Sequence, residues 1–226
     1  MNHDKKRHVI PGEVIISGPY RAEQNTVMLD DKVIATAIGL SEIHDGSVRV
    51  IPLTGIYYPR DDDLVIGKII SHSAMAWEVD INSCYSGMLP ATDVFGRDFS
   101  SSSNDLSSKL SNGDLIVARI ANSDKTRDPL LTISGRELGK IDSGELVNIS
   151  PSKVARLIGK RGSMIQMIEG ETHAQITIGQ NGLIVISCED SDGLLKAIKA
   201  VELVEDNAHV ANLTDQISEM LGKKSD

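Results

Sequence analysis

Aromatic residues and cysteines are scarce in this sequence of 226 residues. Aromatic side chains make up only 3% of the residues, which is thin for a surface that binds nucleic acid by stacking bases. The two cysteines, Cys84 and Cys188, lie far apart and outside any paired spacing, so the sequence indicates neither a disulfide framework nor a zinc knuckle. We therefore expect two buried thiols in a reducing compartment.

Long apolar runs and an excess of positive charge are also missing. The N-terminal residues carry positive charges without an apolar segment behind them, and no later stretch approaches the length of a membrane span. We expect a soluble, cytoplasmic protein with no membrane partner. The 23 Lys and Arg residues against 32 Asp and Glu residues give a net charge of -9, so any nucleic acid must bind at a local basic patch.

Catalytic and metal-binding patterns are absent as well. The six histidines form no motif with ligand spacing, and no serine or cysteine has the partners of a nucleophile. One alternative interprets Asp61, Asp62 and Asp63 as the metal cluster of a nuclease, but three adjacent acids cannot all face one ion from a strand. We interpret them as a solvated linker and expect a protein without enzymatic activity, cofactor or metal.

The hydrophobic content of 40% is sufficient for buried cores, and the length predicts two or three domains. Residues 1–62 have the pattern of short strands, at 27–29, 33–38 and 48–53, and indicate a small N-terminal β domain. An Asp-Asp pair between the first two of these strands predicts a turn. Pro59 and the three aspartates that follow it mark a boundary.

Residues 63–138 keep the strand pattern and predict five strands, which suggests a small closed barrel of the oligonucleotide-binding type. The strands are expected at 65–70, 77–81, 88–89, 115–120 and 130–133. The stretch SSSSNDLSSKLS has seven serines in twelve residues and lies between the third and fourth strands. Its polarity and length predict a mobile insertion.

Three segments, IGKIISHSAMAWEVDINSCYSGMLP, GDLIVARIANS and LLTISGRELG, resemble an S1 domain. The resemblance implies a barrel that binds RNA. Trp77 occupies the aromatic position of the pattern and either stacks on a base or packs in the barrel core. The other candidates for RNA contact are His72, Arg119, Lys125 and Arg127, and the alternative for the last three is a solvated edge.

Residues 144–226 change character and predict the order β, α, α, β, β, α, with a helical extension at the C-terminus. Ser-Pro at 150–151 supplies an N-cap and a first helical residue. Ser163 and Gln166 have the spacing of a capping box at the start of the second helix, and Asn-Gly at 181–182 predicts a two-residue hairpin turn. The chain as a whole therefore predicts a multidomain α+β fold.

The segment Gly159-Lys160-Arg161-Gly162 lies between the two predicted helices. Glycine has no Cβ and permits positive φ, so a sugar-phosphate backbone can come close, and the next helix directs free N–H groups toward it. Residues 151–162 hold four cations and no acid, a local charge of +4; the cations are Lys153, Arg156, Lys160 and Arg161. Together with the element order this segment resembles a KH domain, whose glycine loop binds single-stranded RNA. The alternative for a lone G-x-x-G spacing is a plain turn.

The combination of a β domain, an S1-like barrel and a KH-like domain resembles the S1/KH RNA-binding cap subunits of the archaeal exosome, from about residue 9 to residue 210. The stretches VIPGEVI, VRVIPLTGIYYPRDDDLVIGKI and VARLIGKRGSMI carry the resemblance. That family usually has Gly-Asp before the V-I-G strand, where this chain has Asp62-Asp63. The intact glycine loop favours the archaeal branch.

The resemblance implies a subunit without catalysis that binds single-stranded RNA. Three copies are expected on a hexameric ring of phosphorolytic, RNase PH-like subunits, where they guide RNA to the pore, with or without a second type of cap subunit. The N-terminal domain, through the strands between Val48 and Leu53, is expected to anchor the cap to the ring. The alternative is another S1/KH RNA-binding factor that acts in transcription elongation or on the ribosome.

Overall fold

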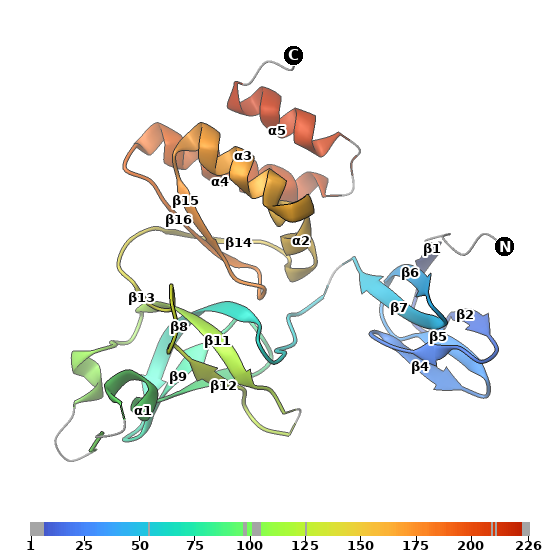
Figure 1. Cartoon of the computed structure of the whole chain (residues 1–226), viewed down its shortest axis with the longest axis horizontal. Coiled ribbons are helices and arrows are strands. Elements are labelled where there is room, and N and C mark those ends of the chain that lie inside the picture. Colours follow the sequence, from blue (N-terminus) through green and yellow to red (C-terminus); the bar gives the residue numbers. More distant parts are fainter. Residues whose placement is uncertain are drawn as a thin grey trace. The chain divides into compact units, whose positions relative to one another are not determined.

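The computed structural model describes residues 7–53, 55–96, 99–100, 105–124, 126–208, 210 and 212–222. The chain forms two compact units that divide between Gly55 and Ile56. The first unit thus ends before the limit at residue 62 that we expected, and residues 56–62 belong to the second unit. In Figure 1 the first unit is built from blue strands, whereas the second combines a barrel with helices that cover a sheet.

Two small sheets form the N-terminal unit, with strand orders β1-β6-β7-β3 and β2-β5-β4. The strands are β1 (Arg7–Val9), β2 (Val14–Ser17), β3 (Arg21–Ala22), β4 (Thr26–Leu29), β5 (Lys32–Ala35), β6 (Gly39–His44) and β7 (Ser47–Pro52). Val9, Ala35 and Val50 form the buried core between them. Asp30 and Asp31 have positive φ values of 45° and 63°, the backbone of a tight hairpin turn. The predicted β domain and its Asp-Asp turn are confirmed.

Five strands of the second unit close into a barrel, because β12 pairs with both β10 and β11. They are β8 (Leu64–His72), β9 (Ala76–Asp80), β10 (Ser86–Pro90), β11 (Leu115–Asn122) and β12 (Leu130–Thr132), and β13 (Gly139–Ile141) adds to β11 outside the closure. Val65, Ile69 and Val79 alternate with outward residues and fill the barrel. The predicted five-stranded barrel is confirmed.

The serine-rich insertion between β10 and β11 is attached to the barrel in its second half. The connection from β10 to β11 contains the helix α1 (Ala91–Phe95) and, within the serine-rich stretch, the 3-10 turn η1 (Leu106–Ser108). Leu106 and Leu110 lie four residues apart and are buried in the barrel core, whereas the three residues between them are exposed. The expectation of a mobile insertion is therefore wrong for residues 105–111, whereas residues 101–104 lie outside the described part of the chain.

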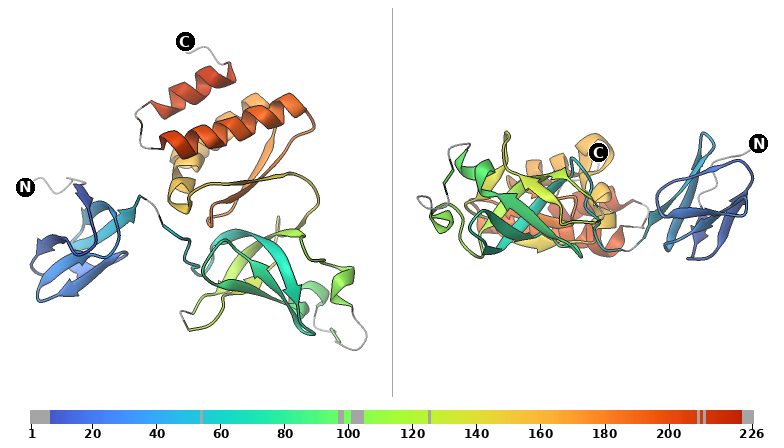
Figure 2. Two further views of the ribbon diagram at one scale, coloured as in Figure 1. Left: turned by 180° about the vertical axis from the view of Figure 1, so that it is seen from behind. Right: turned by 90° about the horizontal axis from the view of Figure 1, so that it is seen from below.

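The remaining elements form an α+β domain in the predicted order. They are β14 (Glu145–Asn148), η2 (Pro151–Lys153), α2 (Val154–Ile158), η3 (Lys160–Gly162), α3 (Ser163–Thr172), β15 (Gln175–Ile178), β16 (Leu183–Ser187), α4 (Ser191–Asn207) and the extension α5 (Leu213–Leu221). The sheet order is β14-β16-β15, and the helices lie on one of its faces (Figures 1 and 2). Leu157, Ile168 and Ile184 are completely buried between the two layers.

The turn that joins β15 to β16 differs from the expected two-residue turn. Gly182 N donates to Gly179 O at 3.1 Å, so Gln180 and Asn181 are the two central residues, and Gly182 follows with φ of 84°. This is a turn followed by a left-handed glycine, which lengthens the loop by comparison with a two-residue connection. The extra length carries Gln180 and Asn181 away from their own sheet.

Asn181 is completely buried where this turn packs on the barrel. Its Nδ2 donates to Ile66 O at 2.7 Å and to Ile81 O at 2.9 Å, while its Oδ1 accepts from Ile66 N at 3.3 Å. Asn82 Nδ2 donates to the Asn181 carbonyl at 2.8 Å. A side chain from the α+β domain is thereby bonded to the strand β8 and to the residue that follows β9.

Gln180 repeats this pattern beside Asn181. Leu64 N donates to Gln180 Oε1 at 2.7 Å, and Gln180 N donates to Leu64 O at 2.8 Å. Val185, on the sheet face away from the helices, is buried as well. The barrel and the α+β domain are therefore two parts of one packed unit.

Two further expectations concern the surface. Among the described residues, no helix is both long and apolar enough to cross a membrane. Cys84 is exposed and Cys188 is half-buried, so the expectation of two buried thiols is wrong for Cys84, which lies in the loop after β9.

Candidate RNA interface

The loop Gly159–Gly162 requires glycine at its first position for two reasons. Gly159 has φ 74° and ψ 178°, a backbone region that side chains essentially exclude. A Cβ on Gly159 would also lie 2.7 Å from Met164 Cβ and 2.8 Å from Met164 N. The loop therefore folds tightly onto the first turn of α3, and its two middle residues point outward.

Lys160 and Arg161 are the exposed residues of this loop. Arg161 has φ 56°, which interrupts the helical path and separates α2 from α3. Neither side chain forms an ion pair with a described residue. Two cations are thus presented side by side in the chain without a protein counter-charge, which suits a phosphate.

The helix α3 begins without a side-chain cap. Its N-cap is Gly162, with φ 81°, and no side chain accepts a hydrogen bond from the first turn. The predicted capping box of Ser163 and Gln166 is therefore wrong, because Ser163 is already the first helical residue. Backbone N–H groups at the start of α3 point to the same side as the loop and can bind an anion.

Lys153 does not contribute a free charge to this surface. Its Nζ donates to Glu205 Oε1 at 2.8 Å and to Glu205 O at 2.6 Å, and its side chain is only 17% exposed. Ser150 donates to the same carboxylate from its Oγ at 2.7 Å and its N at 3.0 Å, in place of acting as a side-chain N-cap. Lys153 is therefore not the free cation that we expected, because Glu205 neutralises it, and its contact with RNA stays a prediction.

The Glu205 carboxylate is held ionised by these contacts. Burial raises the pKa of Glu205, but the hydrogen bonds from Lys153 and Ser150, together with the ammonium charge, outweigh it and place the pKa below its ordinary value. The carboxylate joins the end of α4 to the start of α2. It therefore fixes the helix that leads into the glycine loop.

Arg156 remains as a third exposed cation on α2. One of its guanidinium nitrogens lies 3.5 Å from Val210 O, a long hydrogen bond that leaves most of the donors open. The expected charge of +4 is thus reduced to three outward cations, Arg156, Lys160 and Arg161.

Trp77 lies in the barrel core and not on the barrel surface. It is completely buried, its Nε1 donates to Leu110 O at 3.0 Å, and its ring stacks on Phe95 with centroids 6.2 Å apart. A base cannot stack on this ring while the insertion covers it. Of the two interpretations of Trp77, the structure therefore supports core packing, and we withdraw Trp77 as a stacking residue.

The remaining candidates on the barrel have separate local surroundings. Arg119 donates to Asp62 O at 2.6 Å and lies 3.6 Å from Asp62 Oδ1. Arg127 lines a pocket of about 260 Å³ that also contains Asp124 and Asp128, so acids surround its charge. His72 is exposed at the end of β8. Lys125 lies outside the described residues.

The three aspartates of the linker have separate structural partners. Asp61 Oδ1 accepts from Ser123 N at 2.5 Å, and Asp63 Oδ2 accepts from Tyr57 Oη at 2.7 Å. Burial and the neighbouring carboxylate raise the pKa of Tyr57, so its hydroxyl stays protonated as a donor. With Asp62 beside Arg119, the acids tie the linker to the barrel, which corrects our interpretation of a merely solvated segment.

Three family models match successive parts of the chain. The model described as the Exosome RNA binding protein RRP4 N-terminal domain matches residues 6–54. The Exosome complex component RRP40, S1 domain, matches residues 57–141, and the KH domain matches residues 144–203. The S1 and KH resemblances of the sequence are thereby confirmed.

Named proteins extend this similarity over the whole chain. It is 65% identical over 223 residues to the exosome complex component Rrp4 of Nitrosopumilus maritimus, which covers 99% of both chains. The chain belongs to the Rrp4 family of exosome complex components. Rrp4 of Saccharolobus solfataricus is 34% identical over 219 residues, 96% of this chain and 88% of that protein. The resemblance to archaeal exosome cap subunits was thus a correct prediction of the family.

A solved structure agrees with this membership of the Rrp4 family. A crystal structure described as an exosome complex RNA-binding protein has a TM-score of 0.70 and 40% identity, and covers 74% of this chain and 95% of that chain. We therefore call the barrel the S1 domain and the α+β domain the KH domain.

The contact of Gln180 and Asn181 with the S1 domain was not predicted from the sequence. The available signal was the second G-x-x-G spacing of the KH domain, Gly179–Gly182, which has two amides where the first has two cations. An amide can both donate and accept, so it can be buried against backbone groups. A pattern of glycines alone does not reveal this contact.

Proposed function

We propose that this chain is a cap subunit of the exosome that works in the cytoplasm, captures single-stranded RNA and guides it to the pore of a phosphorolytic 3′–5′ exoribonuclease ring. The observation that carries the proposal is the exposed pair Lys160 and Arg161, which lies directly before the uncapped start of α3. A phosphate bound there receives hydrogen bonds from both side chains and from backbone N–H groups.

The strength of one such site is limited. Three cations on a chain with a net charge of -9 give a weak, salt-sensitive contact, since each neutralised phosphate of a single strand contributes a slope of about -0.7 in log affinity against log salt. Three copies on a hexameric ring of RNase PH-like subunits change this. Once one copy holds the strand, the next meets it at an effective concentration on the order of millimolar.

The arrangement of acids supports a subunit that binds RNA and leaves cleavage to the ring. Asp61 and Asp63 are each bonded to a different partner, and within the described ranges no three His, Cys, Asp or Glu side chains lie close enough to hold a metal ion. Membership of the Rrp4 family favours the exosome over the alternative of a factor acting in transcription elongation or on the ribosome.

The direct test is the double substitution Lys160→Glu with Arg161→Glu. We expect the affinity for labelled poly(A), measured by fluorescence anisotropy, to fall about tenfold or more, with assembly onto the ring unchanged by size-exclusion chromatography. The matched control is Lys196→Glu with Lys199→Glu, which changes the charge equally at two exposed positions of α4. Equal affinities of the two double variants would refute the loop as the RNA site. Gly159→Asp is unsuitable because of its contact with Met164.

A further inference from the structure

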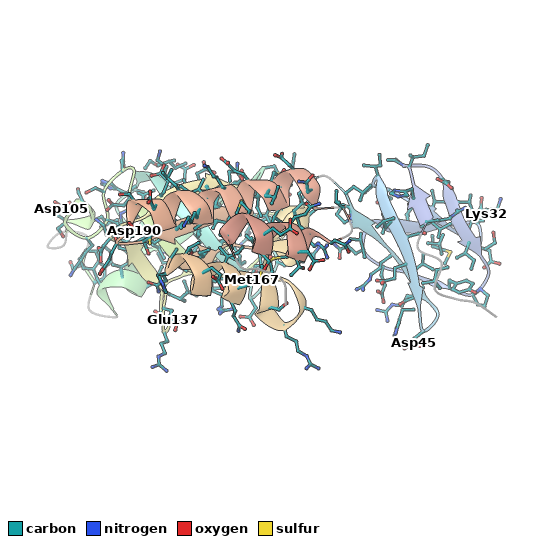
Figure 3. All side chains as sticks on the ribbon, turned by 90° about the horizontal axis from the view of Figure 1, so that it is seen from above. Lys32, Asp45, Asp105, Glu137, Met167 and Asp190 are labelled. Carbon is teal, nitrogen blue, oxygen red and sulfur yellow. The ribbon has the colours of Figure 1, made fainter. Side chains whose placement is uncertain are left out.

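One acidic side chain lies on the same face of α3 as the glycine loop. Gly162 and Glu169 are separated by about two helical turns, so both lie along one face of α3. Ile165 and Gln166 lie between them, since a Cβ on Gly162 would be 3.9 Å from Ile165 Cγ2 and 3.5 Å from Gln166 Nε2. Figure 3 looks down on the helices of the KH domain and labels Met167 on α3, the helix that carries this row.

Glu169 is held in place by an edge strand. Ile176 N donates to Glu169 Oε1 at 3.0 Å. The strand β15, which contains Ile176, is at the edge of its three-stranded sheet and pairs with β16 on its other side. The N–H of Ile176 therefore points out of the sheet, and the carboxylate connects α3 to the edge of β15.

The second oxygen of this carboxylate is available to a ligand. Glu169 Oε2 forms no hydrogen bond or ion pair with a described residue, and the side chain is only half-buried. A contact that served only to join α3 to β15 would need Oε1 alone. An ionised carboxylate accepts hydrogen bonds and cannot donate them, so Oε2 offers an acceptor to a donor group from outside the protein.

The position of Glu169 along α3 suits a strand of RNA that is held at the glycine loop. An α-helix rises about 1.5 Å per residue, which places Glu169 on the order of 10 Å beyond Gly162. Stacked nucleotides are about 3.4 Å apart, and the glycine loop of a KH domain binds about four of them. A strand with one phosphate at Lys160 and Arg161 therefore brings one of its next bases to Glu169.

The strength of RNA binding does not explain a carboxylate at this place. Its negative charge repels phosphates and lowers the affinity of the neighbouring loop. A carboxylate is suited instead to a choice between bases. Adenine and cytosine carry an exocyclic amino group that donates to it, whereas uracil carries a carbonyl oxygen that it repels.

We propose that Glu169 is a specificity-determining residue of the KH domain, which selects a base with an exocyclic amino group over uracil. Glu169 Oε1 stays bonded to Ile176 N, which fixes the carboxylate, and Oε2 accepts a hydrogen bond from the amino group. The inference rests on the proposed function, since the strand must first be bound at Lys160 and Arg161.

The test compares the binding of labelled oligo(C) and oligo(U) to the full chain by fluorescence anisotropy. Their bases are pyrimidines of equal size that carry an amino group and a carbonyl group at the same position. We expect the unsubstituted chain to bind oligo(C) about tenfold more tightly than oligo(U), the discrimination of one well-placed base contact.

The substitution Glu169→Gln should reverse this preference. The amide oxygen can still accept from Ile176 N, and the amide nitrogen then donates to the carbonyl group of uracil. We expect the affinity for oligo(C) to fall and that for oligo(U) to rise, so that oligo(U) becomes the tighter ligand. Glu169→Ala removes both contacts and should bind the two oligonucleotides about equally.

The matched control is Glu202→Gln, which removes an equal charge at an exposed position of α4. We expect it to keep the preference for oligo(C). Lys160→Glu with Arg161→Glu should weaken the binding of both oligonucleotides. Circular dichroism checks the fold of each variant.

The outcomes separate this inference from the proposed function. A reversed preference in Glu169→Gln, with an unchanged one in Glu202→Gln, supports the inference. If the unsubstituted chain binds both oligonucleotides equally, or if Glu169→Gln weakens both by the same factor, Glu169 does not select the base and the inference is overturned, although RNA capture stands. If the unsubstituted chain binds neither oligonucleotide, the proposed function fails together with the inference.

Discussion

Two segments of the KH domain have the same glycine spacing and opposite environments. Gly159–Gly162 has Lys and Arg at its centre and is exposed, whereas Gly179–Gly182 has Gln and Asn at its centre and packs on the S1 domain. A buried charge needs a counter-charge, while the amide of Asn181 satisfies two carbonyls and one N–H by itself. The middle residues, and not the glycines, decide which segment is available for RNA.

The largest effect on stability is expected when the two central residues of the turn Gly179–Gly182 are replaced by those of the exposed loop Gly159–Gly162. Gln180→Lys with Asn181→Arg places one cation in the completely buried site of Asn181, where backbone groups of the barrel offer no carboxylate, and a second at the exposed position 180. We expect a loss of about 4 kcal/mol or more in the free energy of unfolding. Urea unfolding followed by the fluorescence of Trp77, the single tryptophan and a buried one, measures it. A loss below about 1 kcal/mol would contradict our account of this turn.

The two glycines of the exposed loop should differ from each other. Gly159→Ala enters a backbone region that excludes side chains and brings Cβ within 2.8 Å of Met164 N, so we expect about 3 kcal/mol of destabilisation. Gly162→Ala keeps a left-handed φ of 81° with no neighbour closer than 3.5 Å, and about 1 kcal/mol is expected. Thermal and urea unfolding compare the two variants. Equal losses of unfolding free energy in the two variants would show that the close contact with Met164 can be relieved without loss of stability.

Giving the exposed loop the centre of the buried turn tests the reverse direction. Lys160→Gln with Arg161→Asn keeps both glycines and removes two charges. We expect RNA affinity to fall about tenfold and the salt slope to decrease by about 1.4, since two phosphate contacts are lost. Anisotropy titrations at several salt concentrations give both values. The free energy of unfolding serves as the control and should not decrease, because neither side chain has a described ion-pair partner and asparagine tolerates the φ of 56° at position 161.

The smallest effect concerns the contact that leads into the exposed loop. Glu205→Gln removes the carboxylate that Lys153 and Ser150 contact, with an expected loss of about 1 kcal/mol at pH 7. Because folding lowers the pKa of Glu205 from its ordinary 4.5, its contribution is complete above that value and disappears as the pH falls through the folded pKa. The free energies of unfolding of the two proteins should therefore differ at pH 7, and the difference should shrink as the pH is lowered below 4.5. If the difference in stability between Glu205→Gln and the unsubstituted chain does not change with pH, the ion pair with Lys153 is not the cause of that difference.

Much of the fold could be predicted from the sequence. Alternating apolar residues predicted the barrel strands, and apolar stripes with Ser150-Pro151 predicted the first KH helix, because these signals depend on neighbours along the chain. The errors have a common origin. Lys153 was counted as a free cation because Glu205 is far away in sequence, and Trp77 was kept as a stacking candidate because Leu110 covers it from a distant insertion.

The candidate RNA interface shows the same difference between local signals in the sequence and long-range contacts in the structure. By itself the sequence determined the order of three domains and a glycine loop with two adjacent cations, since both follow from residues close together in the chain. Only the tertiary structure decided which charges are free and which glycine turn is buried. Those properties depend on counter-charges, backbone partners and packing layers that long-range contacts bring together, and no local pattern specifies them.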